Sequence, residues 1–252
     1  MICGIDLGSR MVKMVFMDKA EVHATYIFDT IEFYRNHGQK CGELLRVDFR
    51  ELGVPQAKYT IATGYGRNTL GLEGAEVISE LKAHMLGAIY QTKLQDFTLL
   101  DLGGQDSKVI KVRNGRMVDF QTNDKCAAST GRYLENMAAV LGITLEEMSR
   151  HSEEPVELNS TCAIFGETEL IGKIIEGHSA ASLAAGVNYT IFKRIRPMLN
   201  SLRSDMLVFT GGVASSKALQ EIIQQETKIQ VVVPREPQLN GAIGCCVHGM
   251  CK

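Results

Sequence analysis

The sequence predicts an α/β protein built from a duplicated unit. Three short β-rich segments in succession occur twice, at about residues 2–28 and 97–122. Each set is followed by amphipathic helical segments and further short strands. Each set also opens with an apolar strand that ends in Asp-Leu-Gly. A strand–helix pattern that repeats in this way is typical of a duplicated α/β unit, and we place the boundary near residues 91–96.

The expected elements of the first half, residues 1–94, begin with three strands that form a meander. In order, the elements are strands at Ile2–Leu7, Met11–Met17 and Glu21–Phe28, a helix at about Thr30–Leu52, a strand at Lys58–Thr63 and a helix at Glu73–Tyr90.

The second half, residues 95–252, repeats the meander, with Asn114-Gly115 as a hairpin turn. In order, we expect strands at Phe97–Leu102, Ser107–Arg113 and Met117–Thr122, helices at about 131–141, 144–150, 167–176 and 179–203, a strand at Met206–Thr210, a helix at Ser215–Glu226, a strand at Ile229–Val233 and a helix at Gln238–Gly249. The last helix, about 238–250, can pack back on the first half.

Bulk composition restricts the function. Charged residues make up 22% and hydrophobic residues 45% of the 252-residue chain, as in an ordinary globular protein. The net charge is −2 and no basic run occurs, so nucleic acid is not an expected partner. No apolar stretch reaches the ~18 residues of a membrane span, and no signal peptide is visible. Seven scattered cysteines without an export signal indicate reduced thiols and a cytoplasmic location.

Two related loops suggest phosphate binding. The first is Asp6-Leu7-Gly8-Ser9, and the second is the run from Asp101 to Asp106, Asp-Leu-Gly-Gly-Gln-Asp. Glycine lets backbone N–H groups approach phosphate oxygens, and an acid at a strand end can hold Mg²⁺ through water. One such loop is most often a plain hairpin turn. Two, each at the first turn of a repeated unit, predict a nucleotide held between the halves.

A third glycine loop fits the same interpretation. The run from Phe209 to Ala214, Phe-Thr-Gly-Gly-Val-Ala, ends a strand and precedes a helix. Its paired glycines allow close approach of a base and ribose, although taken alone they favour a simple turn into the helix. Asn240-Gly241-Ala242, in the last helix, is a further candidate for the same pocket.

Cys126 and Cys162 each precede an expected helix. A helix N-terminus stabilises a thiolate by ~0.3–1 kcal/mol. Two such thiolates make half of a four-thiolate iron–sulfur site, and a two-fold dimer would complete it. The alternative is a pair of buried, unreactive cysteines.

Taken together, these motifs resemble the activator ATPases of 2-hydroxyacyl-CoA dehydratases. These belong to the BadF/BadG/BcrA/BcrD branch of the acetate kinase, sugar kinase, Hsp70 and actin superfamily. The resemblance covers essentially the whole chain. Its carriers are Asp6-Leu7-Gly8-Ser9, the runs 63–67 (Thr-Gly-Tyr-Gly-Arg), 101–106 and 123–128 (Asn-Asp-Lys-Cys-Ala-Ala), Cys162-Ala163, the run 210–213 and Asn240-Gly241-Ala242. It implies ribonuclease H-like (actin-like ATPase) subdomains with the nucleotide in the cleft between them.

The resemblance also implies roles for individual residues. Those expected to contact ATP/ADP are Asp6, Gly8, Ser9, Lys13, Gly103, Gly104, Gln105, Gly211, Gly212, Val213 and Asn240. Asp6 and Asp101 would coordinate Mg²⁺ directly or through water, and Gln105 would orient the attacking water. For Lys13, the alternative is a solvent-facing side chain.

For the metal centre, the resemblance implies one 4Fe–4S cluster per homodimer, held by Cys126 and Cys162 of each subunit. Cys3 is expected in the core and Cys41 on the surface, and Cys245, Cys246 and Cys251 are not expected to be ligands. Asp106 and Lys125 would connect the phosphate loop to the cluster helix.

The implied function is ATP-driven delivery of a low-potential electron to an iron–sulfur partner enzyme, with ferredoxin or flavodoxin as donor. The partner would be a 2-hydroxyacyl-CoA dehydratase, or alternatively a double-cubane cluster protein or a benzoyl-CoA reductase. Two other classes stay open: a small-molecule kinase of the same fold, and a nucleotide sensor or iron–sulfur scaffold that binds ATP without useful turnover.

Overall fold

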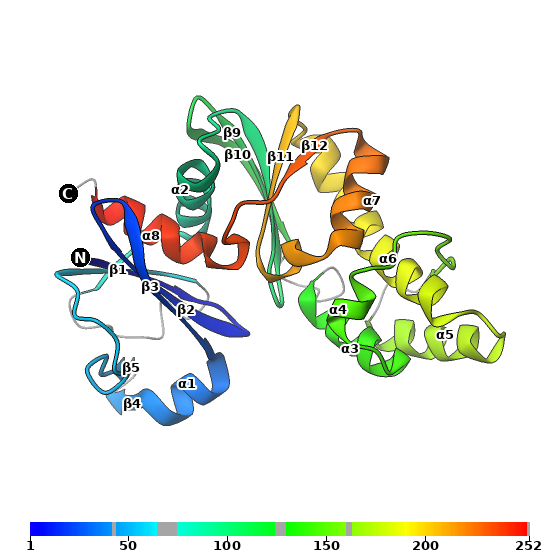
Figure 1. Ribbon diagram of the computed structural model, residues 1–252, viewed down its shortest axis with the longest axis horizontal. Helices are drawn as coiled ribbons and strands as arrows, with labels where there is room; N and C mark the ends of the chain where they lie inside the picture. The colour runs from blue at the N-terminus through cyan, green and yellow to red at the C-terminus, as the bar shows by residue number, and fades with distance from the viewer. Residues whose placement is uncertain (42–43, 65–74, 124–129, 160–162, 251–252) are drawn as a thin grey trace. The chain divides into compact units, whose positions relative to one another are not determined.

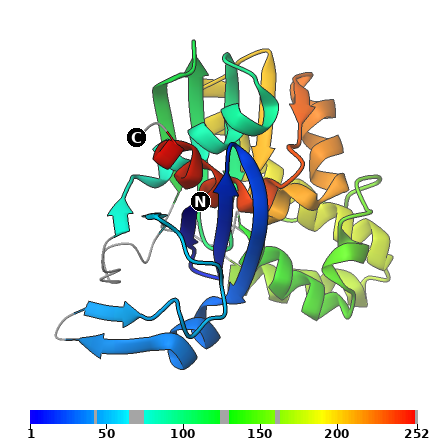
Figure 2. The ribbon, with the colours of Figure 1, turned by 60° about the vertical axis from the view of Figure 1, so that its left-hand side comes forward.

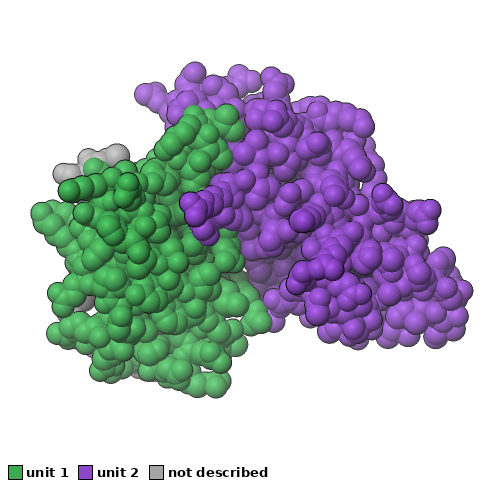
Figure 3. Space-filling model, in the orientation of Figure 1, with its two compact units in different colours: residues 1–94, 238–252 green, residues 95–237 purple. Residues whose placement is uncertain are grey.

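The computed structural model describes residues 1–41, 44–64, 75–123, 130–159 and 163–250. The chain forms two compact units (Figure 3). Unit 1 combines Met1–Leu94 with Gln238–Lys252, and unit 2 is Gln95–Pro237. The last helix of the chain therefore belongs to unit 1.

Unit 1 is built on a five-stranded sheet with the strand order β3-β2-β1-β6-β7 (Figure 1). The strands are β1 (Ile2–Leu7), β2 (Met11–Asp18), β3 (Glu21–Asp29), β6 (Tyr59–Thr63) and β7 (Ala75–Val77). β1, β2 and β3 form the predicted antiparallel meander, whereas β6 and β7 run parallel to β1. The three predicted strands of the meander and the strand ending at Thr63 are confirmed.

Unit 2 repeats this topology with the strand order β10-β9-β8-β11-β12. Its strands are β8 (Phe97–Leu102), β9 (Ser107–Arg113), β10 (Arg116–Asn123), β11 (Met206–Thr210) and β12 (Gln230–Val232). Again the first three strands are antiparallel, and the last two run parallel to the first. Two sheets with the same order and the same strand directions support the predicted duplication.

The helices of unit 1 cover its sheet. α2 (Glu80–Thr92) and α8 (Asn240–Met250) pack closely together, because a Cβ at Gly244 would lie 1.7 Å from the Ala83 carbonyl oxygen. Apolar residues of α8 meet Val15 and Met17 of β2 in one core cluster. α1 (Thr30–His37) lies on the opposite face of the sheet, where Phe33 shares a core cluster with Val12, Met14 and Phe16 of β2. The hairpin β4 (Gly38–Cys41) and β5 (Leu44–Val47) extends beside α1 (Figure 2).

Unit 2 has the larger core. Its helices are α3 (Gly131–Leu141), α4 (Leu145–Met148), α5 (Ala163–Ile175), α6 (Ala180–Ser201) and α7 (Lys217–Thr227). α6 is the central one, since eleven of its residues are buried. Its apolar face meets α3 and the strands β8 and β11 in a single cluster. This core fixes the strand ends that carry the second and third predicted loops.

Two predicted helices are wrong in part. The helix expected at 30–52 ends at His37, and Gly38 is extended (φ −87°, ψ 123°). Gly38–Cys41 and Leu44–Val47 pair as the antiparallel strands β4 and β5 instead. The helix expected at 73–90 begins only at Glu80, where the Ser79 side chain accepts a hydrogen bond from Lys82 N–H. Ala75–Val77 instead extends the sheet as β7, pairing with β6.

Candidate functional site

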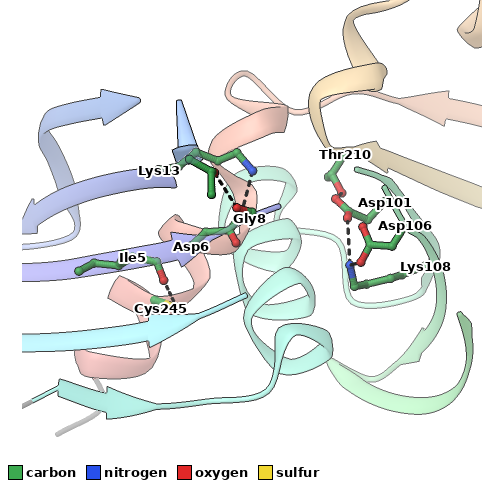
Figure 4. Close-up of polar contacts among 10 residues, drawn as sticks. Ile5, Asp6, Gly8, Lys13, Asp101, Asp106, Lys108, Thr210 and Cys245 are labelled. Atoms are coloured by element: carbon green, nitrogen blue, oxygen red, sulfur yellow. Dashed lines mark hydrogen bonds and ion pairs between the residues drawn. The ribbon is translucent and has the colours of Figure 1, made fainter. Parts of the chain in front are cut away.

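The first predicted loop joins Asp6 to Lys13. Asp6 lies at the end of β1, is 4% exposed, and stands opposite Lys13 of β2 in the antiparallel register. The Lys13 Nζ donates to Asp6 Oδ2 at 3.1 Å (Figure 4). Between these two residues the chain turns through Gly8 and Ser9, and Thr30 Oγ1 donates to the Gly8 carbonyl at 2.8 Å. Lys13 therefore points at the carboxylate rather than away into solvent.

Other residues of unit 1 enclose the Asp6 carboxylate. A Cβ at Gly241 of α8 would lie 3.1 Å from Asp6 Oδ2 and 3.1 Å from His84 Nε2. Burial raises the pKa of Tyr34, and the negative charge of Asp6 raises it further. The carboxylate is thus held in a compact polar position that is walled by α2 and α8.

The second predicted loop has the same design. Asp101, at the end of β8, is 3% exposed and stands opposite Lys108 of β9. The Lys108 Nζ lies 3.9 Å from Asp101 Oδ2 and also donates to Asp106 Oδ2 (Figure 4). Unit 2 thus repeats the Asp–Lys pair of unit 1 in the same strand register.

The backbone of this second loop is tied to the start of α3. The Gly103 N–H donates to the Asp106 carbonyl at 2.9 Å, which closes the loop. The carbonyls of Gly103 and Gly104 in turn accept hydrogen bonds from Gly131 N–H and Arg132 N–H, both at 3.0 Å. The first turn of α3 is therefore fastened directly to the predicted phosphate loop.

Gln105 lies at the exposed tip of this loop, between Gly104 and Asp106. An exposed amide beside two glycines is accessible to a phosphate or a water molecule, as its predicted role requires.

The third predicted loop leaves β11 at Thr210. Thr210 is fully buried, pairs with Asp101 in the parallel register, and its Oγ1 donates to Asp101 Oδ1 at 3.0 Å. Gly211 has φ +89° and ψ 173°, and a Cβ there would lie 2.2 Å from the Leu102 carbonyl oxygen. Gly212 is exposed and begins the 3₁₀ turn η3 (Gly212–Ser215). The backbone at Gly211, just after β11, thus lies so close to Leu102, where the second loop begins, that a side chain would not fit between them.

Two residues that were predicted to contact the nucleotide, Asn240 and Val213, contact other residues of the protein in this structure. Asn240 is fully buried, donating to the His84 carbonyl at 2.8 Å and accepting from Gln91 Nε2 at 3.0 Å. Val213 is 7% exposed, and its Cγ2 would lie 3.4 Å from a Cβ at Gly131. These placements join α8 to α2 and η3 to α3.

The predicted cluster ligands, Cys126 and Cys162, and also Lys125, lie outside the described residues. In the sequence, α3 begins at Gly131, five residues after Cys126, and α5 begins at Ala163, directly after Cys162. Both helices expected after the cysteines are therefore confirmed, and α5 starts four residues earlier than the predicted 167.

Three other cysteines are buried neutral thiols in unit 1. Cys3 is 3% exposed, and Cys245 and Cys246 are fully buried. Burial raises the pKa of all three, to about 12 for Cys246. The Cys245 and Cys246 sulfurs donate to backbone carbonyls, as in the bond from Cys246 Sγ to the Val15 carbonyl at 3.2 Å. Since an iron–sulfur ligand must be a thiolate, these residues do not fit a cluster.

Sequence reasoning missed Lys108 and the hydroxyl of Thr210. The signal for Lys108 was present, because it follows Asp101 by the same interval as Lys13 follows Asp6. The Thr210 contact needs the pairing of β8 with β11, which joins segments far apart in the sequence.

Across the ranges that the structure describes, no three or more His, Cys, Asp or Glu side chains converge on a metal position. No helix in the same ranges combines the length and apolar character needed to cross a bilayer.

The profile of the BadF/BadG/BcrA/BcrD ATPase family matches residues 3–249. The activator of lactoyl-CoA dehydratase from Anaerotignum propionicum is 37% identical, over 97% of this chain and 95% of its own. The (R)-2-hydroxyglutaryl-CoA dehydratase activating ATPase of Acidaminococcus fermentans is 32% identical, over 99% and 96%.

A solved structure agrees with these sequences. The activator of the 2-hydroxyisocaproyl-CoA dehydratase from Clostridium difficile, with bound ADPNP, superposes with a TM-score of 0.83 and 29% identity. The match covers 98% of this chain and 93% of that one. Together with the duplicated sheets, this similarity confirms the predicted actin-like α/β fold. The chain is an ATPase and belongs to the BadF/BadG/BcrA/BcrD ATPase family.

Proposed function

We propose that this ATPase is a homodimeric activator that couples ATP hydrolysis to the delivery of one low-potential electron to an iron–sulfur partner enzyme. The observation that carries the proposal is the direct hydrogen bonding of the second phosphate loop to the first turn of α3. This helix follows the segment that contains Cys126. A change at the phosphates thus has a short covalent and hydrogen-bonded route to a proposed cluster ligand.

The nucleotide would be bound by the two Asp–Lys loops. Backbone N–H groups of Gly8, Ser9, Gly103 and Gly104 would donate to phosphate oxygens. Lys13 is already aimed at the loop, and its ammonium would neutralise phosphate charge. The two buried carboxylates, Asp6 and Asp101, offer the oxygen ligands that Mg²⁺ prefers.

Hydrolysis needs one positioned water molecule. Gln105 lies at the tip of the second loop, where its amide would orient that water toward the γ-phosphorus. The P–O bond to the β-phosphate breaks as the new one forms, which yields ADP and inorganic phosphate. Gly211 and Gly212 would line the adenosine, while Val213 and Asn240 would act from behind, by holding α3 and α8 in place.

The electron carrier would be a 4Fe–4S cluster held by Cys126 and Cys162 of both protomers. Support comes from the starts of α3 and α5 near these cysteines, since helix N-termini offset the charge of an anionic cluster. Cys3, Cys245 and Cys246 do not compete, because their thiols are buried and neutral. When bound, the cluster supplies one-electron chemistry, and the chain supplies its position and its coupling to ATP.

The proposed client is a 2-hydroxyacyl-CoA dehydratase, because the activators to which this chain is similar are named for such enzymes. A double-cubane cluster protein or a benzoyl-CoA reductase is the alternative client. Ferredoxin or flavodoxin would reduce the cluster in the cytoplasm.

Anaerobic purification with iron, sulfide and mass determination tests the proposal. We expect about four irons per dimer, loss of iron in Cys126→Ser and Cys162→Ser, and ATP hydrolysis within a few fold of wild type in both variants. Cys41→Ser is the matched control and should keep its iron. A protein that stays monomeric and colourless after reconstitution would refute the cluster. Phosphorylation of an added sugar or acid would favour a kinase instead.

A further inference from the structure

Lys108 is a buried lysine shared by two carboxylates of the second loop. Its side chain is 8% exposed, and its ammonium contacts both Asp101 and Asp106. Asp101 is almost equally buried, whereas the Asp106 side chain is 32% exposed. One ammonium group thus contacts two carboxylates, and the Asp106 carboxylate is the more exposed of the two.

Asp106 in turn holds the loop that binds α3. Its carbonyl accepts the Gly103 N–H at 2.9 Å, and a Cβ at Gly103 would lie 2.5 Å from its Oδ1. The Gly103 carbonyl then accepts from Gly131 N–H, the first residue of α3. An unbroken set of contacts therefore runs from Lys108 through Asp106 and Gly103 to Gly131.

From this geometry we propose that Lys108 is a positioning residue that transmits the state of the second phosphate loop to α3 through Asp106. The proposal rests on ATP binding at this loop. A magnesium ion at Asp101 repels the nearby ammonium, and a phosphate group attracts it. Either effect changes which of its neighbours, Asp101, Asp106 or the phosphate, the Lys108 ammonium contacts. Asp106 then shifts, and the hydrogen bonds from Gly103 and Gly104 to α3 shift with it.

Unit 1 supplies a matched position in which the loop is connected differently. Lys13 occupies the same register opposite Asp6 and donates to Asp6 Oδ2 at 3.1 Å. The carbonyl of its loop glycine, Gly8, accepts instead from the Thr30 side chain at the start of α1. Lys13 and Lys108 thus occupy equivalent positions in their strands. The neighbouring loops differ, because the Gly8 carbonyl accepts from a side chain of α1 and the Gly103 carbonyl accepts from a backbone amide of α3.

Amide hydrogen exchange at the start of α3 tests the proposal, because the Gly131 and Arg132 amides are themselves the donors to the loop. In wild type, saturation with Mg²⁺ and ADPNP or ADP should change their exchange rates by roughly 5-fold or more. Lys108→Met keeps the apolar stem and removes the charge, and should abolish most of this change. Asp106→Asn should do the same. Because the Asp106 side chain is partly exposed, this variant should fold even if Lys108→Met does not. Lys13→Met should require more nucleotide yet keep the change at saturation.

The outcomes separate the relay from the function on which it rests. If wild type binds no nucleotide, the proposed function itself fails. If wild type binds nucleotide and its α3 amides do not respond, the relay is wrong and the ATPase assignment stands. If the amides respond and both Lys108→Met and Asp106→Asn keep the full response at saturation, Lys108 is not the transmitter.

Discussion

Gly211→Ala should destabilise unit 2 far more than the same change at its neighbour, Gly212. Gly211 adopts φ +89° and ψ 173°, a region essentially restricted to glycine, which costs other residues about 1–3 kcal/mol. The new Cβ would also lie 2.2 Å from the Leu102 carbonyl oxygen, and relieving such overpacking costs a further ~1–3 kcal/mol. The expected loss of unfolding free energy is therefore about 2–6 kcal/mol.

Gly212→Ala is the control, because a Cβ there meets no atom within 4 Å and the residue is exposed. Urea denaturation followed by circular dichroism would measure both variants. With an m-value of about 2 kcal/mol per molar urea, the midpoint of Gly211→Ala should fall by roughly 1–3 M, while that of Gly212→Ala stays near wild type. Midpoints for the two variants that agree within experimental error would refute the close approach of β11 to the second loop.

Two further predictions concern the chemistry. Gln105→Ala should lower kcat for ATP hydrolysis by about 100-fold, with the Kd for ADPNP within a few fold of wild type, because only the attacking water loses its partner; equal loss of binding and turnover would contradict this role. Cys246 has a pKa raised to about 12 by burial, so its contribution to stability is present below pH 9 and lost as the pH rises toward 12. Denaturation between pH 9 and 12 should therefore show a steeper decline in wild type than in Cys246→Ala, and iodoacetamide at pH 8 should leave Cys246 of the folded protein unmodified; an equal slope or ready alkylation would show that this thiol is accessible.

Local patterns predicted most of the fold. The two meanders alternate short apolar strands with Gly, Asn and Asp turns, so β1–β3 and β8–β10 follow directly from the sequence. The helix expected at 30–52 has Leu44, Leu45 and Val47 near its end, and these apolar residues give no clear period. Pairing within a small hairpin, set by the stop at Gly38, decides their structure instead. The sequence did not predict β7, because a strand of three residues shows too little alternation to be recognised. It forms because it pairs with β6, which is a tertiary contact.

The positions of the two loops in the candidate site could also be predicted from local sequence patterns. The repeated Asp-Leu-Gly identified both loops, and the pairing of Lys13 with Asp6 follows from a hairpin register. What the sequence could not give is tertiary: the bond from Thr210 to Asp101 and the seating of α3 on the second loop. The roles of the loop residues in ATP binding, and of Cys126 and Cys162 in binding iron, stay predictions.

The position of α8 has a consequence for how the protein is made. This helix covers Val15 and Met17 of unit 1, and Gly244 presses against the backbone of α2. Ribosomes complete all of unit 2 before they reach α8, so the nascent first sheet emerges with one apolar face bare. During that interval the early strands are exposed to chaperones and to misassociation, and the first unit can close only after its neighbour has been synthesised.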